Sequence, residues 1–213
     1  MSSQAYNPDE HLVDILEPPK YLPTGKTQGI VTAIRAGDWL HTTDVWIYRT
    51  EPVLQILFQQ RRPDSPTYPG VLDCSVAGYL EAGESSVEGG ARETLEELGL
   101  SVDESDLLPF GRRLNAMLDH RGRERKIVAN TNLFKWNGEL EDLNLNADEV
   151  YAVFWVSVTD VLRIEQGASV VIHGINPDGQ QLEKTVTISD FAFNLDGYYF
   201  RIAERIERFE ANQ

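Results

Sequence analysis

Alternating apolar and polar positions predict most of the strands in this chain. The segment "TTDVWIYRT" alternates and is rich in aromatic and β-branched residues, and "PVLQILFQQRR" follows it as an apolar run. We expect two adjacent strands here, joined by a turn near Glu51 and Pro52. The next segment, "RRPDSPTYPG", holds three prolines and predicts a loop. The segments "VLDCSVAGYL", "IVANTNLFKW" and "EVYAVFWVSV" predict three further strands.

Helical spacing of apolar residues appears later in the chain. In "VTDVLRIEQG", Thr159 or Asp160 is placed to cap a short helix that ends at Gly167. The segment "SVVIHGINPDGQQLEKTVTI" predicts a hairpin around its Pro-Asp-Gly turn. The chain closes on "DGYYFRIAERIERFE", a predicted helix. Its expected apolar stripe consists of Tyr199, Ile202, Ile206 and Phe209.

These elements favour an α/β or α+β sandwich, because strands are mixed with three helices. The turn-forming residues of "EPPKYLPTGKTQG" predict a small N-terminal element with short strands. We therefore expect an extension over residues 1–30 and the main domain over residues 31–213, with the C-terminal hairpin and helix included. Between the predicted strands, "VDESDLLPFGRRLNAMLD" indicates loop and strand, and "HRGRERK" indicates a turn.

The net charge of the chain limits the classes of partner that it can bind. The chain has 213 residues with 19 Lys+Arg against 34 Asp+Glu, a net charge of −15. A polyanion is repelled by nucleic acid and by anionic membranes, so we expect neither as a partner. The single cysteine, Cys74, excludes an internal disulfide and fits a reducing compartment. The start of the chain has neither a basic nor an apolar targeting region, so we expect a cytoplasmic protein.

The acidic segment "GYLEAGESSVEGGARETLEELGL" is unusual beside this ordinary pattern. Ser85 and Glu88 predict a capping box at the start of a helix, and Gly99 predicts its left-handed end. The expected sheet-facing side is Val87, Ala91, Thr94, Leu95 and Leu98. Glu93, Glu96 and Glu97 would then share the opposite face, with no Lys or Arg at i+4 to offset them.

Two interpretations of this crowded charge are open. An acidic helix face is commonly solvated surface. However, the carboxylates lie in one narrow sector, and Gly78 and Gly83 precede them in a loop that lets backbone approach a ligand. Several carboxylates beside backbone carbonyls form a hard oxygen site, which suits Mg²⁺ or Mn²⁺ and a phosphate bound through the cation.

The same segment resembles the signature of the Nudix hydrolases, the Nudix box. The matching positions are Gly78, Glu84, Arg92, Glu93, Thr94, Glu96, Glu97, Gly99 and Leu100. Thr94, where an aliphatic residue is usual, is the one mild departure, and Gly89-Gly90 replaces a common Ala-Ala pair. Beyond the box, most of residues 10–165 are similar to the Nudix branch related to isopentenyl diphosphate isomerase.

The resemblance implies a Nudix-type α/β/α sandwich with a mixed sheet, and hydrolysis of a small-molecule substituted diphosphate. It implies that Glu93, Glu96 and Glu97 ligate Mg²⁺ or Mn²⁺, helped by a backbone carbonyl near Gly78, and that one of them orients or deprotonates the attacking water. Arg92 would hold these carboxylates in place, and Glu84 would brace the loop. A homodimer is one option that the sequence leaves open.

Residues outside the box are harder to assign. Arg61 matches an arginine that would meet a phosphate, although a plain surface arginine at a strand end fits equally well. Glu124 is a candidate for a distal acid, with simple solvation of a turn as the stronger interpretation. His41, His120 and His173 are scattered, so we do not expect them to form a metal cluster. The tryptophans Trp46, Trp136 and Trp155 lie in or next to predicted strands and are expected in the core.

Two other functions compete with hydrolysis. The related isomerases use a cysteine followed shortly by a histidine, but the aligned positions here hold Val76, Ala77 and Gly78. Cys74 is two residues early and no histidine follows it, so we expect a small buried strand residue. The other alternative is a non-catalytic sensor that binds a nucleotide diphosphate, although binding alone does not require all three glutamates.

Overall fold

The computed structural model describes residues 11–65, 67–119, 122–192 and 197–213. One sheet runs through the molecule in the order β11-β10-β9-β4-β3-β1-β2, with β5 on β4, β6 on β3, and β8 joining β3 to β7. β3 and β8 run parallel, whereas the other pairs are antiparallel, so the sheet is mixed, as predicted. The N-terminal half contains β1 (Leu12–Glu17), β2 (Leu22–Gly29), α1 (Ile30–Ala36), β3 (Trp39–Arg49), β4 (Gln55–Arg61), β5 (Leu72–Asp73), β6 (Val76–Tyr79) and α2 (Ser86–Leu98).

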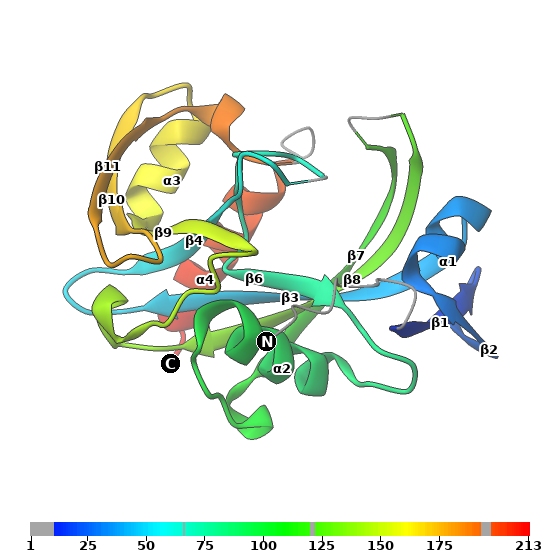
Figure 1. Ribbon diagram of the computed structural model, residues 1–213. Helices are drawn as coiled ribbons and strands as arrows, with labels where there is room; N and C mark the ends of the chain where they lie inside the picture. Colours follow the sequence, from blue (N-terminus) through cyan, green and yellow to red (C-terminus); the bar gives the residue numbers. More distant parts are fainter. Residues whose placement is uncertain (1–10, 66, 120–121, 193–196) are drawn as a thin grey trace, which may run out of the picture.

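The second half begins with a long hairpin that projects from the body beside α1 (Figure 1). Three short 3-10 turns cover residues 104–106, 140–142 and 188–190. The regular elements of this half are β7 (Leu108–Leu118), β8 (Glu124–Lys135), β9 (Val150–Ser157), α3 (Val158–Glu165), β10 (Val170–Ile175), β11 (Gln181–Val186) and α4 (Tyr198–Glu210). Among the described residues no helix is both long and apolar enough to cross a membrane.

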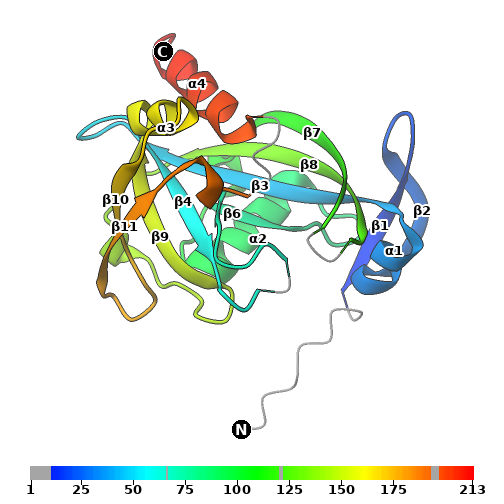
Figure 2. The same cartoon turned by 90° about the horizontal axis from the view of Figure 1, so that it is seen from above.

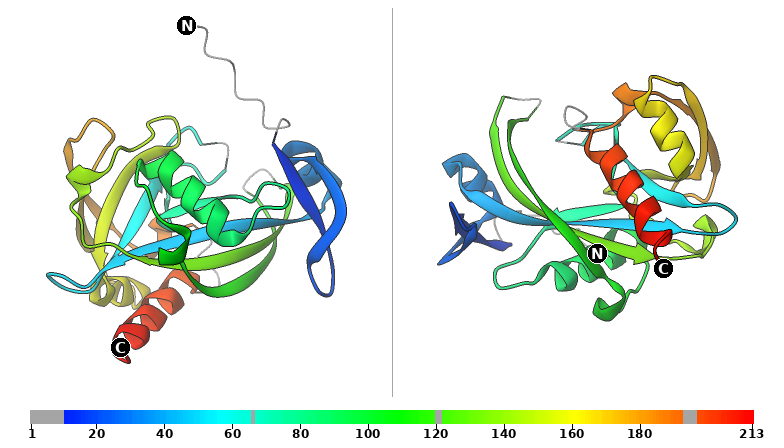
Figure 3. Two further views of the ribbon diagram at one scale, coloured as in Figure 1. Left: turned by 90° about the horizontal axis from the view of Figure 1, so that it is seen from below. Right: turned by 180° about the vertical axis from the view of Figure 1, so that it is seen from behind.

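Alternation along β3 divides the core into two layers. Trp46 and Tyr48 belong to a cluster with α3 and α4, whereas Val45 and Ile47 belong to a cluster with α2. Consequently α2 covers one face of the sheet and α4 the other, as the views from above, below and behind show (Figures 2 and 3). This is the predicted α/β/α sandwich.

The predicted strand over residues 71–80 is divided in two, which corrects the sequence-based boundaries. β5 pairs with β4 and β6 pairs with β3, and the chain crosses between them at Cys74 and Ser75. The Ser75 hydroxyl accepts a hydrogen bond from the Ile47 amide and donates one to the Leu57 carbonyl. The Ser75 side chain therefore replaces a backbone hydrogen bond of the sheet where β3 and β4 diverge.

Other boundaries also differ from prediction. Ser157, not Thr159 or Asp160, caps α3, because its hydroxyl accepts a hydrogen bond from the Asp160 amide. Residues 124–126, expected in a turn, are strand, since β8 starts at Glu124 and pairs with Leu118. The hairpin at Gly179 and the apolar stripe of α4 are confirmed, with Ile202 and Ile206 buried. Whether residues 1–30 form a separate unit stays a prediction; β1 pairs with β3 at Leu16 and Trp39.

Candidate active site

The loop and helix of the acidic segment are built as predicted. The Ser85 hydroxyl accepts from the Glu88 amide, the Glu88 carboxylate accepts from the Ser85 amide, and Gly99 closes α2 with φ 65°. An added Cβ at Gly89 would overlap the Leu80 side chain, and one at Gly90 would lie 3.1 Å from Leu107, which is a tight contact. The paired glycines therefore let α2 pack closely on the sheet.

The N-terminal hairpin braces the loop before α2. The Gly83 amide donates to the Asp14 carboxylate at 2.8 Å, and the Ala82 amide donates to the Leu12 carbonyl at 2.8 Å. Gly83 adopts a positive φ of 83°, a backbone conformation that suits glycine. β1 thus fixes the loop that leads from β6 to the helix.

Arg92 is the centre of the acidic cluster. Its guanidinium donates to Glu84 through two nitrogens, at 2.8 and 2.9 Å, and to Glu93 and Glu96 at 2.9 and 3.1 Å. It also donates to the Tyr79 carbonyl at 3.1 Å, which ties the helix to β6. No basic residue lies four residues after any of the three glutamates predicted as ligands, but Arg92 pairs with Glu96 from four residues before it and so offsets part of the charge. Although burial opposes ionisation of Glu84, Arg92 lowers the pKa of that carboxyl.

The three glutamates do not share one solvated face. Glu93 and Glu97 are only 9% and 5% exposed, whereas Leu95, expected to face the sheet, is 53% exposed. The helix is therefore rotated so that it directs two carboxylates inward, and Glu96 remains half exposed. Burial raises the pKa of Glu93 to about 7, against the opposing effect of Arg92. Burial, and then the charge of Glu93, raises the pKa of Glu97.

Two contacts fix the buried carboxylates. The Gln59 amide on β4 donates to Glu97 at 2.7 Å. The Glu93 carboxylate packs against Gly78, where any Cβ would overlap it. This glycine is therefore required by the glutamate on the neighbouring helix, which gives the predicted Gly78 position a physical reason.

A fourth carboxylate, Glu149, acts on this cluster and was missed in the sequence. Burial and then Glu96 raise the pKa of Glu149, and the charge of Glu149 in turn raises those of Glu93 and Glu97. It directly precedes β9, which pairs with the β4 strand that carries Gln59. The sequence signal for Glu149 was an acidic residue at the start of the predicted strand "EVYAVFWVSV". Glu124 instead forms an ion pair with Lys126 at 3.0 Å and lies close to Gly37.

The donor set suits a hard divalent cation, since carboxylates crowded at low exposure need compensating positive charge. Within the described residues, however, no three His, Cys, Asp or Glu side chains already converge on one point that could hold a metal ion. Arg92 holds two of the glutamates and Gln59 the third. His41 and His173 lie on β3 and β10, which are not neighbours in the sheet, and His120 falls outside the described residues.

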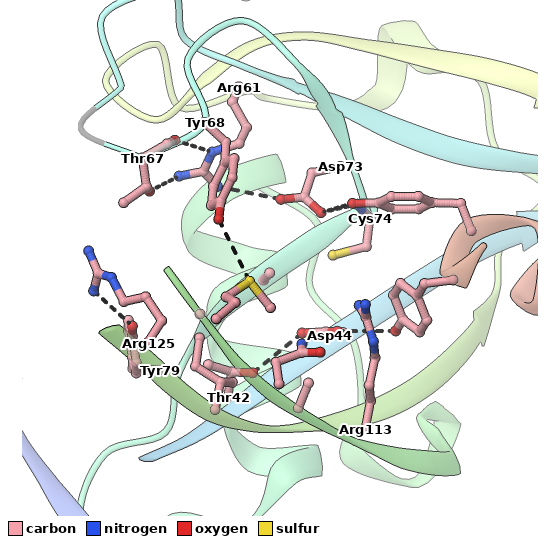
Figure 4. Close-up of a pocket in the computed structure, with 18 residues that line it drawn as sticks. Thr42, Asp44, Arg61, Thr67, Tyr68, Asp73, Cys74, Tyr79, Arg113 and Arg125 are labelled. Atoms are coloured by element: carbon pink, nitrogen blue, oxygen red, sulfur yellow. Dashed lines mark hydrogen bonds and ion pairs between the residues drawn. The ribbon is translucent and has the colours of Figure 1, made fainter. Parts of the chain in front are cut away.

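A cavity of about 310 Å³ adjoins the cluster through Gly78 (Figure 4). Its walls come from β3, from the loop after β4, from the inner side of the β7–β8 hairpin and from the start of α4. Arg61, Arg113 and Arg125 supply positive charge, and Asp44 and Asp73 supply negative charge. Arg61 is not a plain surface residue, because it donates to the Thr67 carbonyl at 3.0 Å and pairs with Asp73 at 3.7 Å.

Cys74 lines the same cavity as a buried thiol. Its sulfur contacts the Val76 carbonyl at 3.4 Å. Burial, and next the charge of Asp73, raises the thiol pKa well above its ordinary value. A protonated thiol is a poor nucleophile, so the expectation of a small buried residue is confirmed. Trp46 lies in the core, as expected, and Trp155 stacks on Trp136 with 6.1 Å between ring centroids.

Comparison with known proteins places this geometry in context. A family model described as "NUDIX domain" matches residues 40–173. An uncharacterised Nudix hydrolase of Clostridium acetobutylicum is 27% identical over 198 residues, 90% of this chain and 94% of that protein. An isopentenyl-diphosphate Delta-isomerase of Shigella flexneri is 28% identical over 144 residues, 64% of this chain and 76% of that one. The fold is also similar to a crystal structure from Deinococcus radiodurans, with a TM-score of 0.52 and 19% identity over 73% of this chain and 90% of that one.

Proposed function

The chain belongs to the Nudix family, and from this premise we propose that it is a Mg²⁺-dependent hydrolase. Its substrate would be a nucleoside diphosphate derivative or a similar substituted diphosphate, cleaved at the phosphoanhydride linkage. The observation that carries the proposal is the pair of buried carboxylates, Glu93 and Glu97, beside a cavity that arginines line, with Glu93 packed against Gly78 in the cavity wall.

Nudix proteins generally use divalent metal ions, and the carboxylates of this chain are suited to hold one. We assign Mg²⁺ or Mn²⁺ to Glu93, Glu96 and Glu97, with a backbone carbonyl near Gly78 and with Glu149 as a further acidic neighbour. Such a cation, when bound, neutralises diphosphate oxygens and lowers the pKa of an attacking water. One of the glutamates would orient or deprotonate that water.

The remaining residues position these groups. Arg92 and Gln59 hold the glutamates by charge-assisted hydrogen bonds, and Glu84 holds Arg92 through both of its oxygens. Arg61 and Arg125 line the cavity on the side of Tyr79 and would meet the phosphate oxygens. Phosphoanhydride hydrolysis needs mainly positioning and charge neutralisation, which this arrangement supplies.

The isomerase alternative gains support from the Shigella flexneri relative but loses it at the site. The cavity lining includes a thiol whose pKa is raised by burial, and no histidine is among the described residues that line it. The sensor alternative leaves unexplained why two glutamates are held at low exposure beside Arg92. The dimer and the cytoplasmic location stay predictions.

A substrate panel with Mg²⁺ tests the proposal. It comprises nucleoside di- and triphosphates, nucleotide sugars, dinucleotides, thiamine diphosphate and prenyl diphosphates, with products identified by mass. We expect at least one substituted diphosphate to gain the mass of water and split, and Glu97→Gln to abolish this product. Conversion of a prenyl diphosphate to an isomer of equal mass, with no hydrolysis of any compound, would support the isomerase instead.

A further inference from the structure

The cavity has a second polar centre where β3 meets the start of α4. Asp44 on β3 lies inside it, and the Tyr198 hydroxyl on α4 donates to Asp44 Oδ2 at 3.1 Å (Figure 4). The Thr42 hydroxyl approaches Oδ1 at 3.5 Å, near the limit of a hydrogen bond. The Arg113 guanidinium stacks 4.2 Å above the ring of Tyr198. None of these groups takes part in the mechanism proposed above.

Tyr198 is held firmly, so its contact with Asp44 is a built feature. The Trp46 indole donates to the Tyr198 hydroxyl at 3.2 Å, and the Thr131 hydroxyl lies 3.3 Å from it. Tyr198 is itself buried, with 7% of its surface exposed. A phenol fixed on three sides directs its one proton toward the carboxylate of Asp44.

Asp44 retains acceptor capacity toward the cavity. When it is ionised, the Asp44 carboxylate offers about four acceptor positions, and among the described residues Tyr198 and Thr42 are the hydrogen-bond donors to its side chain. Its neighbour Asp73 is different, because the Tyr199 hydroxyl and the Cys74 amide both donate to Asp73 Oδ1, and Arg61 lies 3.7 Å from Oδ2. Asp73 therefore shapes the wall, whereas Asp44 is placed to receive a ligand.

We propose that Asp44, held by Tyr198, is a specificity residue that accepts a hydrogen bond from a neutral N–H or O–H group on the non-phosphate part of the substrate. This inference rests on the proposed function, since it assigns the other half of the same substrate. The diphosphate would lie toward Gly78, Arg61 and Arg125, and the organic moiety toward Asp44.

The charges and polarity of the cavity select this chemical class. An apolar prenyl chain would cover Asp44 without a donor and leave a buried acceptor unpaired, which weakens binding. A cationic moiety would have to lie close to the Arg113 guanidinium, which stacks on Tyr198 in the same cavity, although Asp73 adds negative charge there. A nucleobase or a sugar carries neutral donors, so both sources share the required chemistry.

The inference also gives α4 a role. The family model ends at residue 173, whereas Tyr198 belongs to α4, outside the matched segment. A helix outside the segment that the family model matches therefore supplies the group that orients Asp44. The residues that set substrate specificity would then lie outside the box, on β3 and α4.

The test compares substrates that share a diphosphate core. The probes are diadenosine diphosphate, UDP-glucose, isopentenyl diphosphate and methyl diphosphate, each with Mg²⁺. For wild type we expect diadenosine diphosphate or UDP-glucose, whose organic parts carry N–H and O–H donors, to exceed both donor-free compounds in kcat/KM, and the better of the two serves as the reference compound. Preference is measured as the ratio of kcat/KM for that compound to kcat/KM for methyl diphosphate.

Asp44→Asn and Asp44→Leu should lower this preference about 10- to 100-fold, mainly through KM, the range expected for loss of a hydrogen bond to a charged group. Tyr198→Phe should lower it less, because Asp44 remains but loses its orienting donor. Tyr48→Phe is the matched control, since it also removes a tyrosine hydroxyl between β3 and α4, the one bonded to Glu210 at 2.6 Å. Its preference should equal that of wild type.

The two proposals fail in different ways. If no probe and no panel compound is hydrolysed, the proposed function falls and this inference falls with it. If hydrolysis occurs but isopentenyl diphosphate is preferred, or the Asp44 and Tyr198 variants keep the wild-type preference, only the inference is overturned. Should Asp44→Leu fail to fold by circular dichroism, the isosteric Asp44→Asn and Tyr198→Phe decide the question.

Discussion

The two helices that flank the sheet, α2 and α4, differ in whether their own sequences indicate the role proposed for them. α2 breaks local rules, with paired glycines and crowded glutamates, and each break has a structural partner: Gly89 meets Leu80, and Glu93 meets Gly78. α4 breaks none, since it is an ordinary amphipathic helix whose buried side packs on the core. Yet its first residue, Tyr198, binds a carboxylate inside the cavity. Departure from local propensity identifies a site only where the site strains its own element.

The largest expected effect comes from α2. Glu97→Gln keeps the shape of the side chain but removes one ligand charge, so turnover should fall by at least about two orders of magnitude. The fold should persist, because the amide can still accept from Gln59. Steady-state kinetics on the substrate found in the panel, with circular dichroism as the control, measure this. Hydrolysis near the wild-type rate would remove Glu97 from the cation site.

Arg92→Ala should reduce both activity and stability. The substitution leaves Glu84 and Glu93 without their shared cation, and an uncompensated buried charge costs about 3–5 kcal/mol; partial exposure of Arg92 reduces this figure. We expect a lower melting temperature together with a loss of kcat that added Mg²⁺ restores only in part. Unchanged melting would show that Arg92 does not organise the carboxylates.

The pH dependence of stability should reveal the buried acids when a chelator is present. Burial raises the pKa values of Glu93 and Asp44 to about 7, from ordinary values of 4.5 and 3.8. The folded state thus holds these protons more tightly than the unfolded state, so the two residues lower stability progressively as the pH rises from about 4 to 7. Arg92 has the opposite effect on Glu84, whose pKa is lowered and whose contribution is lost as the pH falls below its unfolded value.

We therefore expect the free energy of unfolding, measured by urea titration in chelator, to decrease between pH 5 and pH 7.5. Glu93→Gln and Asp44→Asn should each flatten this slope. An increase in wild-type stability over the same pH interval would contradict the burial of these charges. So would variants whose stability changes with pH as steeply as that of wild type.

The smallest effect concerns the outer end of α4. Tyr48→Phe removes the hydrogen bond to Glu210, which also pairs with Lys135 at 3.0 Å. A single hydrogen bond to a charged group contributes about 1.5–3 kcal/mol, and the remaining partner lessens the loss. A modest fall in melting temperature without a change in catalysis is expected. Loss of substrate preference would show that the whole of α4, and not Tyr198 alone, shapes the cavity.

The sequence predicted the features that depend on the local chain and missed those that depend on how the elements pack. Periodicity predicted the strands and the stripe of α4, because apolar spacing depends on the local chain alone. The box predicted Gly78, Glu84, Arg92 and the glutamates as a group, but helical spacing placed Glu93, Glu96 and Glu97 on the face opposite the sheet. The burial of Glu93 and Glu97 depends on how α2 is rotated against β4 and β6, which no spacing within the helix determines.

The sequence alone does not predict the remaining features, because they join segments that are distant along the chain. Glu149 affects the cluster across β9, and Asp44 meets Tyr198 over 154 positions in the chain. Ser157 lies in the predicted strand "EVYAVFWVSV" and also ends β9, so the sequence pattern does not indicate its role as the cap of α3. In each case a residue acts through a partner brought to it by the sheet.

The most direct test of the central claim is the metal response of the melting temperature in wild type and in Glu96→Gln/Glu97→Gln. A cation that binds only the folded site stabilises by about 2.7 kcal/mol at a hundredfold excess over Kd. Millimolar Mg²⁺ or Mn²⁺ should therefore raise the wild-type melting temperature by several degrees, and sodium at matched ionic strength should not. The double variant should melt higher than wild type in chelator and lose most of the metal response. A double variant that is less stable in chelator and still shifts fully with Mg²⁺ would show that the glutamates of α2 do not hold the cation.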